Sequence, residues 1–183
     1  MLSKFPELAE IYKNVNGKCI LDGEIVVLAG GVPDFYRLQK RTMLTDRFKI
    51  EMEAKRFPAS FVAFDCIYQK NQELVFQSLM ERKHKLSTMV TENDRIAVSR
   101  YIEKEGLALY RAAETRELEG VVAKRKESLY LMGKRTKDWV KFKRMADEDF
   151  IVAGYIPKGG HTFSLVLAKY RLGSLVYKGH VTS

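Results

Sequence analysis

The sequence LEGVVAKRKESLYLMGKRTKDWVKFKR, residues 118–144, holds two strand-like runs around a basic segment. The runs at 119–125 and 139–143 are short and mostly apolar, and Gly-Lys-Arg-Thr at 133–136 is typical of a turn region. From Lys124 to Arg144 there are nine Lys or Arg and two acids, so most of the formal charge of +9 lies here. The stretch predicts two neighbouring strands with a dense positive charge.

Side chains alternate across a strand, so Lys141 and Lys143 are expected on one face, together with Trp139. Two ammonium groups about 7 Å apart on one strand can straddle a phosphate. Glu119 is the lone acid at the start of the first run. A carboxylate beside paired lysines is typical of Mg²⁺ held against a phosphate. In that first run, Val122 is expected on the face opposite Glu119.

Two further runs, at 18–28 and 60–68, are rich in β-branched or aromatic residues and predict buried strands. The first should begin with a tight turn at Asp22–Gly23 and supply a buried acid, Glu24. The second places Phe64 and Asp65 at its polar end.

Helices are expected at 33–44 and 46–56 and in the apolar-periodic segments 77–90 and 99–117, where Ile102 should share a stripe with Leu109 and Ala113. An acidic break at 146–149 precedes three strand-like runs. We therefore expect a domain boundary near Ala146, giving domains at 1–146 and 147–183. Three strands are too few for a closed barrel, which needs about five, so the chain is expected to stop within the second domain.

The composition indicates a globular, intracellular protein. Of 183 residues 46% are apolar, enough to bury a core, and a pI near 9.5 favours a polyanionic partner. The absence of a long apolar run predicts no membrane partner. Cys19 and Cys66 stand alone and there are three His, so neither a disulfide framework nor a zinc site is predicted, and a reducing cytoplasm fits.

Read in order, DGEIVVL, FVAFDCIY, EGVVAKR and WVKFKR resemble the motifs of covalent nucleotidyltransferases, specifically ATP-dependent DNA ligases of the bacterial nonhomologous end-joining type. The resemblance implies an α+β adenylation domain of antiparallel sheets with flanking helices, followed by an incomplete OB-fold. It also implies a reaction used in DNA repair and recombination. AMP passes from ATP to a lysine and then to a DNA 5′-phosphate, and a 3′-hydroxyl displaces it.

Site roles follow from the same resemblance. Glu24 would contact the ribose or assist metal binding, Phe64 would stack on adenine and Val122 would close the other side of the base. Glu119 would bind Mg²⁺ or Mn²⁺, while Lys141 and Lys143 would hold the α-phosphate of ATP. The expected DNA-binding residues are Lys124, Arg125, Lys126, Lys134, Arg135 and Lys137.

The resemblance also implies partners and a location. The expected partner is nicked or broken duplex DNA, bound without reading its sequence, and end-joining proteins are further candidates. The implied location is a prokaryotic cytoplasm, in association with the nucleoid.

The sequence departs from the family in one decisive motif. It has no K-x-D-G, the motif that carries the nucleophilic lysine, and Lys18 stands four positions before Asp22, at the wrong spacing. The chain begins where the second family motif would end, so we expect a ligase fragment that forms no covalent adenylate alone. The alternatives are an RNA ligase or capping guanylyltransferase, which share the scaffold, and a nucleic-acid-binding module without catalysis.

Overall fold

The computed structural model describes residues 2–144 and 148–182. The chain divides into two compact units, Met1–Arg144 and Met145–Ser183, and each is considered by itself. The predicted boundary residue, Ala146, lies outside the described residues.

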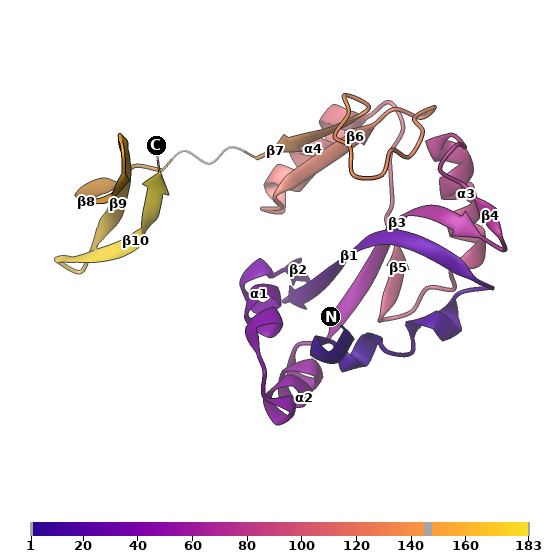
Figure 1. Ribbon diagram of the computed structural model, residues 1–183, viewed down its shortest axis with the longest axis horizontal. Helices are drawn as coiled ribbons and strands as arrows, with labels where there is room; N and C mark the ends of the chain where they lie inside the picture. The colour runs from indigo at the N-terminus through magenta and orange to yellow at the C-terminus, as the bar shows by residue number, and fades with distance from the viewer. Residues whose placement is uncertain (1, 145–147, 183) are drawn as a thin grey trace. The chain divides into compact units, whose positions relative to one another are not determined.

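The first unit is built on a five-stranded sheet in the order β2-β1-β3-β4, with β5 pairing parallel to β3 (Figure 1). The other pairings in this sheet are antiparallel. A separate antiparallel pair, β6 with β7, follows helix α4. The elements in chain order are the 3-10 helices η1 (Leu2–Lys4), η2 (Pro6–Leu8) and η3 (Ile11–Asn14), then β1 (Cys19–Ala29), β2 (Val32–Pro33), α1 (Phe35–Met43), α2 (Arg47–Arg56), β3 (Ala59–Gln69), β4 (Gln72–Glu73), α3 (Leu79–Met89), β5 (Ile96–Val98), α4 (Gly106–Thr115), β6 (Gly120–Lys124) and β7 (Trp139–Lys143).

The core lies on both ends of β3. One cluster joins Ala63 and Cys66 of β3 to Leu86 and Met89 of α3 and to Ile96 of β5. The other cluster contains Phe5, Leu8, Val27 and Ala59. Helix α3 is fixed over the sheet at its start by a capping box, in which Ser78 and Glu81 each satisfy the other's backbone N–H.

The predicted strands and helices of this unit are confirmed, with two corrections. Helix α4 begins only at Gly106, and Ile102 lies outside it with its side chain 53% exposed. The backbone at Lys104 has φ 66°, which a right-handed helix cannot continue through. The Asp22–Gly23 pair forms no tight turn but lies inside β1, where the strand passes through an irregularity in its pairing with β3.

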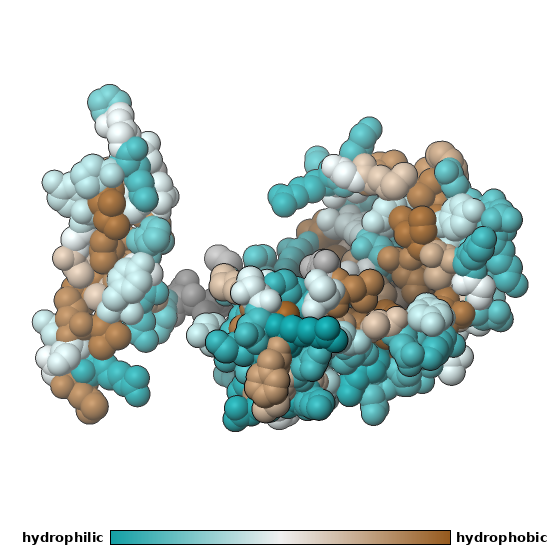
Figure 2. All heavy atoms as spheres, turned by 60° about the horizontal axis from the view of Figure 1, so that its bottom comes forward, coloured by the Kyte–Doolittle hydropathy of each residue, from teal (hydrophilic) through white to brown (hydrophobic). Residues whose placement is uncertain are grey.

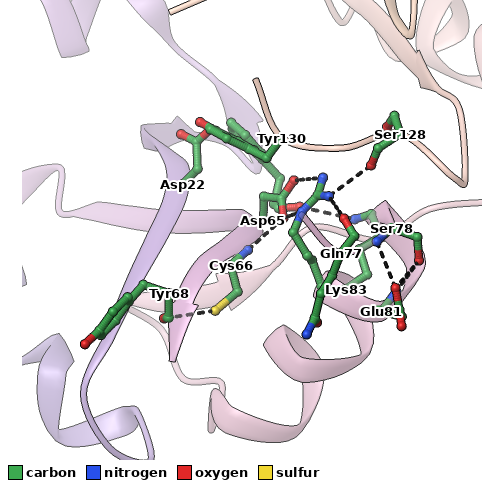
Figure 3. Close-up of polar contacts among 12 residues, drawn as sticks. Asp22, Asp65, Cys66, Tyr68, Gln77, Ser78, Glu81, Lys83, Ser128 and Tyr130 are labelled. Carbon is green, nitrogen blue, oxygen red and sulfur yellow. Dashed lines mark hydrogen bonds and ion pairs between the residues drawn. The ribbon is translucent and has the colours of Figure 1, made fainter. Parts of the chain in front are cut away.

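A buried ion pair holds the first sheet, α3 and the segment between β6 and β7 together (Figure 3). Asp65, labelled in Figure 3, lies in the middle of β3, not at its polar end. Both Asp65 and Arg82 of α3 are fully buried. The contact is bidentate, with Nε–Oδ1 at 2.8 Å and Nη2–Oδ2 at 3.0 Å. Arg82 also donates to the carbonyl of Ser128 at 2.9 Å. One guanidinium therefore links three elements far apart in the sequence.

Two further hydrogen bonds fasten the same segment. The Tyr130 hydroxyl donates to Asp22 of β1 at 2.6 Å, and the Trp139 indole N–H donates to the Ser128 hydroxyl at 3.2 Å. Burial is the largest cause that raises the pKa of Tyr130 to about 12, so the phenol stays a donor at neutral pH. The segment thus carries β7 to a fixed place beside the first sheet.

The second unit is a three-stranded antiparallel sheet in the order β10-β9-β8. Its strands are β8 (Ile151–Gly159), β9 (Thr162–Arg171) and β10 (Ser174–Thr182), which confirms the three predicted strands. Ser164 and Ala168 of β9 are buried, but many apolar side chains of the second unit are exposed. Figure 2 shows apolar residues along the surface of this unit.

The predicted fold class, a mixed α and β protein of antiparallel sheets with flanking helices, is confirmed. None of the helices in the described ranges has the length and apolar character that a bilayer span requires.

We expect Asp65→Asn to lower the free energy of unfolding by about 3–5 kcal/mol, because it leaves the buried guanidinium without its counter-charge. Urea denaturation measures this change. The control is Arg47→Gln, which breaks an exposed pair with Glu51 and should cost less than about 1 kcal/mol. Equal losses in the two variants would show that the buried pair is no anchor.

Candidate functional site

The β6–β7 pair brings together the two strand-like runs of residues 118–144. Val122 pairs with Lys141, and Gly120 pairs with Lys143. Gly120 has φ 145°, and a Cβ there would lie 2.0 Å from the carbonyl oxygen of Phe142. Only glycine permits this close approach, so the Glu119-Gly120 dipeptide sets the geometry at the start of β6.

Glu119 accepts from both predicted phosphate lysines. Its Oε1 lies 2.8 Å from Lys141 Nζ and 3.3 Å from Lys143 Nζ. The hydrogen bonds from Lys141 and then Lys143 lower the pKa of Glu119, so the carboxylate is ionised at neutral pH. All three side chains are exposed, so they can exchange partners when a ligand binds. The arrangement is an anionic group between two cations, open to solvent.

A divalent ion at this place would take few protein ligands. Across residues 2–144 and 148–182, no three His, Cys, Asp or Glu side chains gather in a way that could hold a metal. Mg²⁺ is commonly bound by one or two carboxylates, substrate phosphate oxygens and water. Glu119 fits that chemistry as one exposed carboxylate.

Phe64 sits at a bulge in β3. Asp22 pairs with Asp65 and Gly23 pairs with Ala63, so Phe64 is the extra residue between two ladder partners. A bulge of this kind re-aims one side chain and is frequent next to binding sites. Gly23 has no room for a side chain, because a Cβ would meet the Phe61 ring at 2.4 Å. The DGE sequence therefore places a glycine where β1 has no room for a Cβ, next to the point at which β3 bulges.

Two contacts join Phe64 to the β6–β7 pair. Its ring packs edge to face against Trp139, with centroids 6.4 Å apart and planes at 80°. The Lys124 ammonium lies 4.4 Å from the centroid of Phe64 and 3.5 Å from that of Trp139. Phe64, Trp139 and Lys124 thus form one aromatic and cationic cluster, which we call the ring cluster.

Lys124 differs from the cations around it. It is half-buried, and burial is the main cause that lowers its pKa to about 8, opposed by the nearby Asp65. Lys124 was predicted to contact DNA, whereas its ammonium lies on the Phe64 ring, which was predicted to hold adenine. Strand alternation carries a signal for this, because Lys124 shares a face with Val122, the residue predicted to close the other side of the base.

Glu24 is exposed, so the expectation of a buried acid at this position is wrong. It lies opposite Val62 in the β1–β3 ladder, two residues before the Phe64 bulge. The buried acid of this sheet is Asp65, which the sequence analysis placed at a strand end. Alternation alone could not separate the two acids, because they lie on different strands and only packing shows which one is covered.

The remaining predicted DNA cations are exposed. Arg125 is 3.4 Å from Asp138, and Lys126 pairs with Glu103. For Lys134, Arg135 and Lys137, no ion pair is formed with any carboxylate in the described ranges. These three lie between β6 and β7 and present free charge to solvent.

Residues 1–143 match the sequence model of the ATP dependent DNA ligase domain. The chain belongs to this family. The chain is similar to the SPbeta prophage-derived DNA ligase-like protein LigB of Bacillus subtilis. The two are 31% identical over 157 residues, which cover 85% of this chain and 54% of that protein. DNA ligase C1 of Mycolicibacterium smegmatis is 33% identical over 175 residues, 91% of this chain and 50% of that one.

A solved structure supports the same family for this chain. Mycobacterial DNA ligase D, in complex with ATP and MES, superposes with a TM-score of 0.62 and 26% identity, over 98% of this chain and 55% of that one. The 183-residue chain spans about half the length of these relatives.

We expect Lys124 to titrate near pH 8, well below its ordinary value of 10.5. Between these values the unfolded chain binds a proton that the folded chain lacks, so the free energy of unfolding should rise with pH. Nuclear magnetic resonance of the lysine ε-carbons measures the titration, and urea denaturation at several pH values measures the rise.

The Lys124→Met variant should lose both the signal and the rise, whereas Lys137→Met, at an exposed site, should keep both. A Lys124 signal that titrates above pH 10 would show that the ammonium lies in water.

Proposed function

We propose that this chain provides the nucleotide pocket of an ATP-dependent DNA ligase that acts in end joining or related DNA repair. Unit Met1–Arg144 would be the adenylation domain and unit Met145–Ser183 part of an OB-fold domain. The observation that carries the proposal is the placement of Lys141 and Lys143 within hydrogen-bond reach of the same Glu119 carboxylate oxygen. A carboxylate and two ammonium groups suit a metal-bound phosphate chain.

The ring cluster supports a purine next to that phosphate site. Stacking of a base on an aromatic side chain is worth about 1–3 kcal/mol. Phe64 would hold adenine, Val122 would close its other side and Glu24 would reach the ribose. Lys124 would then leave the ring face or share it with the nucleotide, a role that its ring contacts favour over the predicted DNA contact.

The chemistry would proceed through charge placed in advance. Lys141 and Lys143 would leave Glu119 for the α-phosphate and stabilise negative charge as it develops there. Glu119 would then be free for Mg²⁺ or Mn²⁺, which would supply charge neutralisation on the phosphate oxygens. The attacking lysine amine would come from a K-x-D-G motif, which the 183 residues lack.

Duplex DNA is the proposed second substrate. Arg125, Lys126 and the free cations Lys134, Arg135 and Lys137 would contact its phosphates, which fix position without reading sequence. The names of the LigD relatives, a bifunctional protein in Bacillus subtilis and a multifunctional one in Mycobacterium bovis, support nonhomologous end joining as the setting.

The proposal predicts that Phe64→Ala weakens AMP binding by about 1–3 kcal/mol, through lost stacking. Isothermal titration calorimetry measures the affinity. Phe35→Ala is the matched control, because Phe35 is an exposed ring on α1, and it should leave the affinity unchanged. Equal affinity in the folded Phe64→Ala variant and the parent would mean that this ring only fills the core.

The function itself is tested by adding a nucleophile. Labelled ATP should leave no AMP on the 183-residue chain, but it should label a fusion in which a K-x-D-G segment precedes Leu2. In that fusion, Glu119→Ala should remove most labelling at ordinary Mg²⁺ concentrations, because the metal loses its protein carboxylate.

Lys137→Met in the same fusion should retain the label. Strong labelling of the chain alone would contradict the assignment of the nucleophile. An unlabelled fusion that still binds AMP and duplex DNA would favour a binding module without catalysis.

A further inference from the structure

A cavity of about 370 Å³ lies between α3 and the segment that runs from the end of β5, at Val98, to Tyr101. Its α3 wall is one helical face, since its residues recur at intervals of three and four. The opposite wall is tied to the central strand, because the Ser99 N–H donates to the Ala63 carbonyl at 2.8 Å. The lining residues are Met80, Lys83, His84, Ser87, Val98, Ser99, Arg100 and Tyr101.

The lining is cationic and rich in donors. Lys83 and Arg100 supply an ammonium and a guanidinium, Ser87 and Ser99 supply hydroxyls, and none of the lining residues is an acid. A concave site with this chemistry selects an anion with several acceptor oxygens, as a phosphate has. The volume falls within the range of about 300–1,000 Å³ that is usual for ligand sites.

Lys83 is the least satisfied of these groups. It is half-buried, and its Nζ has a long hydrogen bond of 3.4 Å to the carbonyl of Phe64. No carboxylate in the described parts of the chain forms an ion pair with it. Burial is the main cause that lowers its pKa. The nearby Asp65 opposes this shift, but its carboxylate pairs with Arg82, so an anion in the cavity would give the ammonium a counter-charge of its own.

Arg100 and Tyr101 extend the site toward solvent. The Arg100 side chain is 81% exposed and lies 2.6 Å from Glu92. A guanidinium has five N–H donors, so this pair leaves several of them for a phosphate. The Tyr101 ring is half exposed and lies 5.0 Å from the Lys83 ammonium. A ring beside a phosphate site suits the sugar or base attached to that phosphate.

We propose that this cavity binds a backbone phosphate of DNA, through Lys83 and Arg100, with Tyr101 against the adjoining sugar. The inference rests on the proposed function, because it names a contact for the DNA substrate. The Phe64 carbonyl that Lys83 contacts belongs to the residue proposed to stack on adenine, so one lining residue of the cavity touches the backbone of the proposed base site. The phosphates of ATP have the same chemistry, and the experiment must separate the two sources.

The test uses the full chain and a 5′-phosphorylated nicked duplex followed by fluorescence anisotropy. The double variant Lys83→Met, Arg100→Gln should bind the duplex at least about tenfold more weakly, since two charged contacts are lost. Its slope of log K against log salt should fall by about two units. Its affinity for AMP and ATP should stay within about twofold of the parent.

The control removes one ammonium and one guanidinium that do not line the cavity and that are each paired with an acid, by Lys13→Met with Arg47→Gln, and should keep most of the affinity and slope. Lys83→Arg, which keeps the cation, should retain binding. Equal duplex binding by the double variant and the control would overturn the cavity site while leaving the proposed function standing.

Two other outcomes also decide the question. Weaker ATP binding with unchanged duplex binding would overturn DNA in favour of ATP as the source of the phosphate. A parent chain that binds no duplex would overturn both the DNA site and the proposed substrate.

Discussion

The bidentate pair of Asp65 with Arg82 is the constraint on which the rest of the first unit depends. Two charges that are fully buried must satisfy each other, because neither can reach water. Arg82 also donates hydrogen bonds to backbone carbonyls, including that of Ser128 between β6 and β7. The cost of burying charge is thereby offset by contacts that fix three elements in one arrangement.

The candidate chemistry follows from that arrangement. With the 125–138 segment held, Trp139 comes against Phe64, and β7 aligns Lys141 and Lys143 beside Glu119. The residues that would touch a nucleotide are exposed or half-buried, whereas those that place them are buried. This division suits a site whose charged groups must change partners when ATP and a metal arrive.

The lysines of the first unit lie in different environments. Lys141 and Lys143 are exposed and paired with an acid, Lys124 lies on two aromatic rings, and Lys83 lines a cavity with no acid. Burial sets them apart, since it lowers the pKa of Lys124 and Lys83. Of the cations predicted to contact DNA, Lys124 thus differs from the exposed ones, because its ammonium lies on the rings of the ring cluster.

The sequence by itself determined the elements and the family. Short apolar runs predicted β1, β3, β6, β7 and the three strands of the second unit, and the ordered motifs resembled those of the ligase family, because both signals are local. Local patterns could not show that β3 bulges at Phe64 opposite Asp22 and Gly23, that Glu24 is exposed, or that Asp65 is buried. Those outcomes, and the cavity between α3 and residues 98–101, depend on contacts between segments far apart in the chain. Burial and pairing across such distances are properties of the tertiary structure, since it alone decides which side chains share an environment without water.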